Sequence, residues 1–297
     1  MRKGICSATS ILAGTLMLVG GIATSGAQPS FTKEKVSFES QTSSGAGVSV
    51  RGELQLPDTG EARLPAVLVL HSSSGSGHDR HSGPFIELLN RAGIATLWID
   101  MFPDRSSRPR STRDSMPKVF GSLLYLAAHA RIDPQRIGVM GFSWGGVVSL
   151  LTVSQELVQE YVNGKAQFAA HLGFYPVCWA QQQVLSGSNR MYGAGTYQQV
   201  TGAPVHILAG EQDDYDEPDS CPKFVAALPE EVRKHFGVTV YPGAYHSFDA
   251  PIAPSKSYDR YANAGRGGSV RLGYEPKAAA QSRAFTVEFF SKHLAKN

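Results

Sequence analysis

The chain has 297 residues, of which 42% are hydrophobic and 18% are charged, so it is long enough to bury a sizeable core. The formal net charge is +3, and Arg2 and Lys3 supply two of these charges at the N-terminus. The rest of the chain is therefore close to neutral, which argues against the class of strongly basic nucleic-acid-binding proteins.

Residues 1–27 have the pattern of a secretory signal peptide. The positively charged start leads into an apolar run at 11–22, and Ser25-Gly26-Ala27 supplies small residues for cleavage before Gln28. A membrane anchor is the alternative, but the run is shorter than the roughly 20 residues of a spanning helix. Cys6 precedes this run, whereas a lipoprotein cysteine would follow it. We expect an exported protein, periplasmic or secreted, without a stable membrane anchor.

Strand and helix patterns alternate along the first half of the remaining chain. The predicted elements are an edge hairpin (36–38 and 48–56), a buried strand (64–70), a helix (85–92), a second buried strand (94–99), a loop (105–113), a helix (118–129) and a buried strand (136–140).

The second half continues the same alternation. The predicted elements are a helix that ends near residue 161, strands at 168–175, 205–209 and 238–241, part of a short helix at 224–228, and an amphipathic helix at 278–294. The irregular segment 251–272 is either a loop beside the active site or a solvated excursion, and we favour the excursion. The alternation predicts a mostly parallel sheet with helices on both faces, in one domain over residues 28–297.

The segment Gly141-Phe142-Ser143-Trp144-Gly145 matches the Gly-x-Ser-x-Gly motif of a nucleophile elbow. A predicted strand precedes the motif and a run typical of a helix follows it. Such a turn strains the backbone at the serine and exposes its hydroxyl, while the flanking glycines allow close backbone approach. The motif is weak by itself, but this context predicts Ser143 as a nucleophile.

A serine nucleophile needs a base, and the base needs an acid that orients it. In α/β-hydrolases the order along the chain is Ser, Asp or Glu, His, and the acid and base lie in loops after strands. His246 follows the last predicted strand and is the predicted base. Asp213 follows the preceding strand and is the predicted acid, with Asp214 as the second choice and Glu211 and Asp216 as further rivals.

Two backbone N–H groups should stabilise the oxyanion of the tetrahedral intermediate. We expect one from Trp144, the residue after the nucleophile, and the other from the loop 71–75. Ser73 is the predicted donor in that loop. Because Ser72 stands where glycine is common in such loops, the donor is uncertain by one position.

Removal of the leader would leave two cysteines, Cys178 and Cys221. An even pair in an exported protein suggests a disulfide, and two buried free thiols are the alternative. A thiol nucleophile is a poorer interpretation because the elbow already carries serine. The sequence has neither the Cys/His spacing of a metal site nor a phosphate-binding glycine loop, so we expect no metal and no organic cofactor.

From about residue 48 to residue 294 the chain resembles the dienelactone hydrolase family of the α/β-hydrolase superfamily. The resemblance rests on Arg131-Ile132-Asp133-Pro134 leading into the elbow, on the acid loop 210–214 and on Pro242-Gly243-Ala244-Tyr245-His246. It implies an α/β-hydrolase fold with an eight-stranded, mostly parallel sheet and a triad of the Ser/Asp/His type.

The resemblance also has two local consequences. Founding members of the family use cysteine at the elbow, where this chain has Ser143, and this favours a general serine esterase over the original lactone specificity. Some exported relatives carry one cysteine after the Tyr-Pro of the sixth strand and another after the acid loop. Cys178 and Cys221 match that pattern, which supports the disulfide.

These observations predict an exported serine hydrolase that cleaves a small-molecule carboxylic ester or lactone through an acyl-enzyme on Ser143. A peptidase or amidase of the prolyl-oligopeptidase type is an alternative, although nothing suggests the propeller domain that such enzymes usually add. A non-catalytic binding protein on a hydrolase fold is another, although such proteins usually lose a triad residue. No nucleic-acid partner is indicated, and the sequence leaves the substrate and the oligomeric state open.

Overall fold

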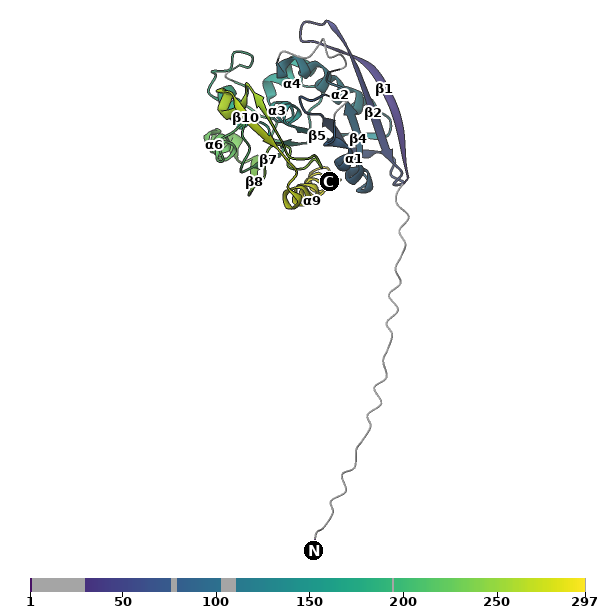
Figure 1. Cartoon of the computed structure of the whole chain (residues 1–297). Helices are drawn as coiled ribbons and strands as arrows, with labels where there is room; N and C mark the ends of the chain where they lie inside the picture. Colours follow the sequence, from purple (N-terminus) through teal and green to yellow (C-terminus); the bar gives the residue numbers. More distant parts are fainter. Residues whose placement is uncertain (2–29, 76–78, 103–110, 194, 297) are drawn as a thin grey trace.

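The computed structural model describes residues 1, 30–75, 79–102, 111–193 and 195–296. An eight-stranded sheet runs through the molecule in the order β1-β2-β4-β3-β5-β6-β7-β8 (Figure 1). Its first two strands form an antiparallel hairpin at one edge, β2 pairs antiparallel with β4, and all other neighbours are parallel. The strands are β1 (Phe31–Gln41), β2 (Gly47–Pro57), β3 (Leu64–Leu70), β4 (Ala95–Ile99), β5 (Ile132–Phe142), β6 (Ala170–Phe174), β7 (Val205–Gly210) and β8 (Phe236–Tyr241).

Helices cover both faces of the sheet, so each central strand is buried on two sides. Along β3, Val67 and Val69 join one apolar cluster, while Leu68 and Leu70 join the cluster on the opposite face. This explains the continuous apolar runs in the sequence. One face is covered by α1 (Ser82–Arg91) and α9 (Pro276–His293), and the other by α2 (Met116–Ala128), α3 (Trp144–Leu151), α4 (Gln155–Val162), α5 (Cys178–Leu185) and α6 (Ser220–Ala227) (Figure 1).

The predicted long helix after the elbow is wrong, because the structure divides it into α3 and α4. Between them, Ser154 is extended and forms an isolated bridge with Val200. The carbonyl of Val153 also accepts a hydrogen bond from the N–H of Thr201. The run Thr152-Val153-Ser154 favours helix weakly, and pairing with the distant segment outweighs that preference.

The preferred interpretation of 251–272 as a solvated excursion is also wrong. This segment forms a two-stranded antiparallel hairpin, β9 (Ser255–Asp259) and β10 (Gly268–Leu272), joined through the short helix α8 (Ala262–Gly265). Its strands are mostly exposed, so they lack the alternating burial that would reveal them in sequence. The remaining short elements are η3 (Thr112–Ser115), within the predicted loop, and α7 (Glu230–Arg233).

The strand order places a crevice at one point of the sheet. The chain leaves β3 toward β4 on one side and then returns to β5 on the other side. In open parallel sheets, loops at the carboxyl ends of strands diverge at such a switch point and form the binding site. The loop after β3 and the elbow after β5 both end at this crevice.

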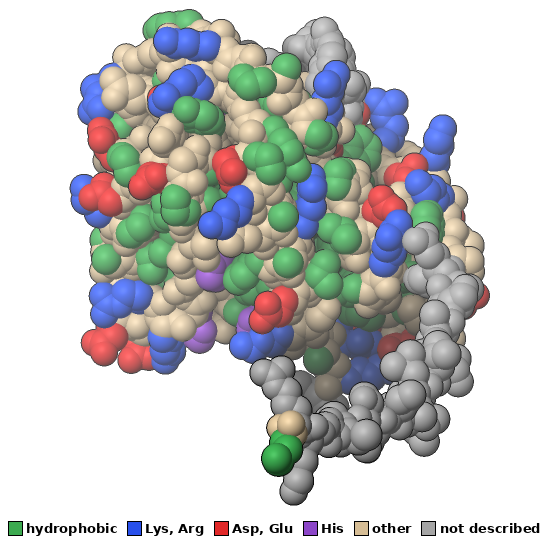
Figure 2. All heavy atoms as spheres, turned by 60° about the horizontal axis from the view of Figure 1, so that its bottom comes forward, with side chains coloured by type: hydrophobic (Ala, Val, Ile, Leu, Met, Phe, Trp, Pro, Cys, Tyr) green, Lys and Arg blue, Asp and Glu red, His purple; other side chains and the backbone are tan. Residues whose placement is uncertain are grey.

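The surface carries a mixture of side-chain types. On the face presented in Figure 2, basic, acidic and hydrophobic side chains are interspersed. Among the described residues, no helix combines the length and the apolar character of a membrane span. The predicted signal peptide at 1–27 lies outside the described residues except for Met1.

Candidate active site

The elbow holds Ser143 in a strained backbone conformation. This residue has φ 50° and ψ −110°, a region that non-glycine residues rarely adopt, and its N–H donates to the carbonyl of Phe174 over 2.9 Å. The neighbouring glycines make the turn possible. A Cβ on Gly146 would lie 2.6 Å from the carbonyl oxygen of Phe174, and a Cβ on Gly145 would clash with the carbonyl oxygens of Leu70 and His71. The half-buried Ser143 hydroxyl therefore lies at the carboxyl end of β5, beside the ends of β3 and β6.

The structure brings Ser143, His246 and Asp213 together in a line of hydrogen bonds. Nε2 of His246 lies 2.9 Å from Oγ of Ser143, and Nδ1 of His246 lies 2.7 Å from Oδ2 of Asp213. The side chains of His246 and Asp213 are both about 4% exposed. With Nδ1–H donating to the carboxylate, the neutral imidazole keeps Nε2 as an acceptor toward the serine hydroxyl.

The rival carboxylates of the acid loop are engaged elsewhere. Asp214 accepts hydrogen bonds from Nε and Nη2 of Arg271, each over 2.8 Å. Burial opposes ionisation of Asp214, but the bonds and charge of Arg271 outweigh burial and lower the pKa of Asp214. Glu211 accepts the N–H of Gly243 over 2.9 Å. Of the carboxylates proposed from the sequence, the structure thus places Asp213, and not Asp214, in contact with His246.

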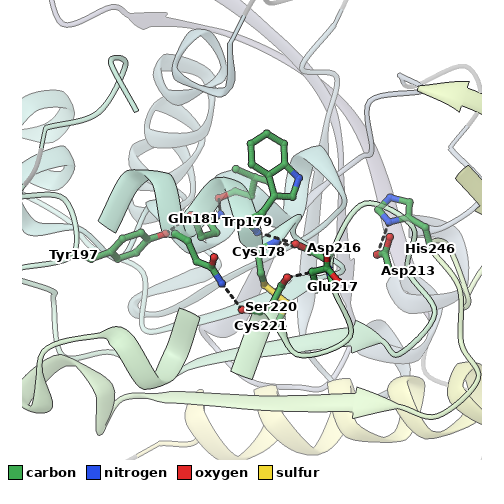
Figure 3. The surroundings of a disulfide bond; sticks show 12 residues. Cys178, Trp179, Gln181, Tyr197, Asp213, Asp216, Glu217, Ser220, Cys221 and His246 are labelled. Carbon is green, nitrogen blue, oxygen red and sulfur yellow. Dashed lines mark hydrogen bonds and ion pairs between the residues drawn. A yellow bond between two sulfur atoms is a disulfide. The ribbon is translucent and has the colours of Figure 1, made fainter. Parts of the chain in front are cut away.

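Asp216 lies at the N-terminus of α5 and not at the imidazole. Its two oxygens accept the N–H groups of Cys178 and Trp179 over 2.6 and 2.8 Å (Figure 3). Burial and the nearby carboxylate of Asp213 raise the pKa of Asp216 to about 7. Asp216 therefore caps the N-terminus of α5.

Two tyrosine rings hold the imidazole of His246. The centroids of Tyr175 and Tyr215 each lie 4.5 Å from the centroid of the imidazole. The N–H of Tyr215 also donates to Oδ1 of Asp213 over 3.0 Å, which occupies the oxygen that His246 does not use. These contacts limit rotation of both the imidazole and the carboxylate.

A second, buried histidine–aspartate pair lies behind this arrangement. The hydroxyl of Tyr175 donates to Oδ1 of Asp249 over 2.6 Å, and Nδ1 of His81 lies 3.0 Å from Oδ2 of Asp249. Asp79 accepts the N–H of His81 and the indole N–H of Trp98 over 3.1 and 2.7 Å. Burial lowers the pKa of His81, but the charges of Asp249 and Asp79 and the bond to Asp249 outweigh burial, so the pKa is raised.

The two predicted oxyanion donors lie on opposite sides of Ser143 in sequence but line the same cavity. Trp144 begins α3, so its N–H has no acceptor within its own helix. Ser73 belongs to the loop after β3. In that loop Nε2 of His71 accepts the N–H of Met101 over 2.9 Å and Nδ1 lies 2.7 Å from the carbonyl of Ser72. The loop is therefore anchored beside the elbow.

A cavity of about 720 Å³ opens at Ser143. The indole of Trp144 forms part of its wall, where it donates to Oγ of Ser115 over 3.1 Å and meets the ring of Phe102 edge to face. The side chain of Trp144 thus forms an apolar wall of the site. A larger cavity, of about 1180 Å³, lies between the β1–β2 hairpin and α1, and Ser143 does not line it.

Cys178 and Cys221 form the expected disulfide, which joins α5 to α6 (Figure 3). The two sulfur atoms also lie near a carboxylate oxygen of Asp216. This cluster does not have the chemistry of a metal site, because sulfurs bonded to each other supply no thiolate ligands. The bond instead ties a wall of the cavity to the helix that follows the acid loop.

Sequence reasoning missed several residues that shape the site. Tyr175 and Tyr215 flank the imidazole, Trp179 lines the cavity, and β9 and α8 bring Tyr258 and Tyr261 to its rim. The one available signal was the aromatic and arginine content of the irregular segment. That content does not indicate which surface the segment covers.

The family model of the dienelactone hydrolase family matches residues 51–294. A Bradyrhizobium protein named "Probable 2-oxo-3-(5-oxofuran-2-ylidene)propanoate lactonase" is 24% identical over 199 residues, which cover 63% of this chain and 74% of that protein.

Two solved structures show the same fold. Thermogutta terrifontis esterase 2, phosphorylated by paraoxon, is 17% identical, with a TM-score of 0.61 and coverage of 89% of this chain and 96% of that chain. Est1E from Butyrivibrio proteoclasticus is 16% identical, with a TM-score of 0.58 and coverage of 88% and 99%. With the elbow, the acid loop and the sheet order in place, the match over most of the sequence shows that this chain belongs to the dienelactone hydrolase family, within the α/β-hydrolase superfamily.

Proposed function

We propose that this chain is a serine hydrolase that cleaves a carboxylic ester or a lactone through an acyl-enzyme on Ser143. The observation that carries the proposal is the continuous line from Ser143 Oγ through His246 to Asp213, with distances of 2.9 and 2.7 Å. Nucleophile, base and orienting acid in hydrogen-bond contact are the arrangement that acyl transfer requires. The lactonase and esterase names of the relatives agree with this class of substrate.

In the proposed first step, Oγ of Ser143 attacks the carbonyl carbon and Nε2 of His246 takes the hydroxyl proton. Asp213 keeps the imidazole in the required tautomer and stabilises its positive charge. The N–H groups of Trp144 and Ser73 donate to the oxyanion. Each such donor contributes roughly 3 kcal/mol to transition-state stabilisation in comparable sites.

The intermediate then collapses and the bond from carbon to the alkoxy oxygen breaks. The imidazolium returns its proton to that oxygen, so an alcohol leaves, or in a lactone the ring opens and its hydroxyl stays attached. Water next attacks the acyl-enzyme, His246 again takes the proton, and Ser143 Oγ is released as the hydroxyl. The cycle uses one water molecule and returns every proton.

We also propose that the protein is exported. The support is the leader pattern at residues 1–27 together with the Cys178–Cys221 disulfide, a bond that persists in oxidising compartments.

One preparation tests both proposals: the full chain, expressed in a Gram-negative host, is labelled with a fluorophosphonate probe in the periplasmic fraction. We expect a labelled band whose mass corresponds to a chain that begins at Gln28. Ser143→Ala should abolish labelling because the attacking oxygen is gone, and His246→Ala should reduce it at least 100-fold. Ser149→Ala is the matched control, because the hydroxyl of this buried serine of α3 donates to the carbonyls of Gly146 and Leu172 and has no part in the proposed mechanism, so labelling should stay intact.

The outcomes separate the two proposals. A folded protein that resists the probe would overturn the serine mechanism wherever the protein is found. Labelled protein confined to the cytoplasm with residues 1–27 attached would overturn export alone.

A further inference from the structure

The cavity at Ser143 is far larger than a small ester or lactone needs. Its volume of about 720 Å³ lies within the range of roughly 300–1,000 Å³ that accommodates a drug-sized ligand. The walls come from α3, α5, η3 and the β9–β10 hairpin, elements that are widely separated in sequence. This enclosure indicates that part of the substrate beyond the reacting carbonyl is recognised.

Aromatic rings make up about a third of the residues that line the cavity, together with aliphatic and uncharged polar side chains. Seven aromatic side chains line the cavity: Phe102, Trp144, Trp179, Tyr192, Tyr215, Tyr258 and Tyr261. Tyr192 is buried, and its hydroxyl lies 2.8 Å from Oγ1 of Thr112, which leaves its ring as a wall. The rings of Phe102 and Trp144 meet edge to face at 5.7 Å.

Charged groups play little part in the described lining. They are limited to Asp259 and Arg260, both beside the hairpin turn. The carboxylate of Asp259 accepts the hydroxyl of Tyr215 over 2.8 Å, and the guanidinium of Arg260 lies 4.8 Å from the ring centroid of Tyr261. Both groups thus contact tyrosines of the lining, and the rings stand among uncharged side chains.

The elements that carry the aromatic rings of the rim are anchored to the rest of the structure. Arg271 on β10 forms the paired hydrogen bonds with Asp214, and its guanidinium lies 4.6 Å from the ring centroid of Tyr245. The indole of Trp179 packs so closely on α8 that a Cβ added to Gly265 would lie 2.8 Å from its Cη2. The disulfide fixes the start of α5. A rigid rim lowers the entropic cost of binding a rigid, planar group.

We propose that this cavity selects esters that carry a planar aromatic ring, and that Tyr258 and Tyr261 on the hairpin side are specificity-determining residues. The proposal rests on the proposed ester hydrolysis at Ser143 and adds its substrate class. Offset or edge-to-face packing favours an aromatic ring over a saturated ring of similar size. Tyr258 is 76% exposed and Tyr261 46% exposed, so both rings have free surface to contribute.

The experiment compares kcat/KM within matched pairs of esters. Methyl cinnamate is paired with methyl 3-cyclohexylacrylate, and benzyl butyrate with cyclohexylmethyl butyrate. Each pair keeps the ester chemistry and replaces a flat ring by a saturated ring. We expect an aromatic preference of about tenfold in at least one pair. The pair with the larger preference identifies the half of the ester that enters the cavity.

The variant Tyr258→Ala/Tyr261→Ala should reduce that preference to less than about threefold. Tyr274→Ala is the matched control, because Tyr274 is 37% exposed but does not line the cavity, and it should keep the wild-type ratio. Thermal unfolding of all three proteins checks that the fold is intact. Because kcat/KM is compared within one pair of esters, a loss of activity that affects both esters equally cancels in the ratio.

Three results are informative. A preference that falls in the double variant and persists in Tyr274→Ala supports the proposal. Hydrolysis of both members of each pair at equal rates, or a preference unchanged in the double variant, overturns it while leaving ester hydrolysis standing. Absence of hydrolysis of every ester, together with no fluorophosphonate labelling, overturns the proposed function itself.

Discussion

Backbone geometry at single residues decides which side chains of the elbow and the acid loop meet. The positive φ of Ser143 directs its hydroxyl toward His246, and the glycines around it remove the Cβ atoms that would block this turn. A sequence motif is enough to predict this because glycine at these positions has a steric reason. By contrast, four carboxylates lie within six residues of the acid loop. Their position after the strand favours Asp213, but it does not show which of them contacts His246.

Asp213 and Asp214 offer a direct test at this scale. Asp213→Asn should lower kcat by roughly 10³–10⁴-fold, because an amide at this position no longer holds His246 in the tautomer that accepts the serine proton. Asp214→Asn should lower kcat less than about tenfold, because it breaks the ion pair with Arg271 but leaves the imidazole contact unchanged. The measurement is kcat on one ester for the two purified variants. Equal losses would contradict the assignment of Asp213 as the orienting acid.

Elements far apart in sequence support the site through a few polar contacts. The β9–β10 hairpin is held by Arg271 against Asp214, and the loop that carries His246 is held through the contact of its Asp249 with His81. These contacts join segments 57 and 168 residues apart. Neither partner has a local pattern that indicates the other, so the sequence alone suggested a solvated segment at 251–272.

The His81–Asp249 pair predicts a pH-dependent contribution to stability. Burial disfavours the charged imidazole, but Asp249 and Asp79 outweigh burial and raise the pKa of His81 above its ordinary value of about 6.5. The folded protein therefore binds this proton more tightly than the unfolded chain. The resulting stabilisation is complete below about pH 6.5 and is lost as the pH rises through the raised value.

Replacing His81 by Gln should lower the free energy of unfolding by about 3 kcal/mol at pH 6, because Asp249 loses its charged partner in a buried position. The loss should be smaller at pH 8. Urea denaturation at both values measures it, with His129→Gln as the control at a partly exposed histidine. Asp216 also loses stabilisation as the pH rises, between its ordinary pKa of 3.8 and its raised pKa of about 7. The effect of His81→Gln is therefore taken as the difference from wild type at each pH. A loss that does not depend on pH would refute the charged state of His81.

At the scale of the whole molecule, the order of the strands creates the site. The reversal around β3 opens the crevice into which the loop after β3 and the elbow after β5 both project. Apolar clusters on both faces then hold the strands in register. The disulfide between Cys178 and Cys221 links α5, which forms part of the cavity wall, to α6.

The disulfide should contribute to global stability mainly through the unfolded chain. It links residues 43 positions apart, and the chain-entropy model assigns roughly 4 kcal/mol to a loop of that length. The double variant Cys178→Ala/Cys221→Ala should show a free energy of unfolding lower by about that amount. Dithiothreitol should lower wild-type stability toward the level of the variant without affecting the variant. Wild type that unfolds identically with and without reductant would contradict this role.

The sequence by itself determined the features that local sterics and burial control. The edge hairpin, the two-sided burial of β3, the elbow at Ser143 and the loops that carry Asp213 and His246 all follow from patterns within a few residues of each other. The disulfide partners were also suggested, because only two cysteines remain after the predicted leader.

Tertiary structure alone decided the rest, because these features depend on contacts between distant segments. The contact of Asp213, the first choice from the sequence, with His246 and the pairing of Asp214 with Arg271 are visible only in the structure. The irregular segment became the rim of the cavity once β9 and β10 paired. The division between α3 and α4 likewise came from pairing with Val200. For the helix division and for the irregular segment, hydrogen bonds between distant segments outweighed a weak local preference, and a single sequence carries no record of such bonds.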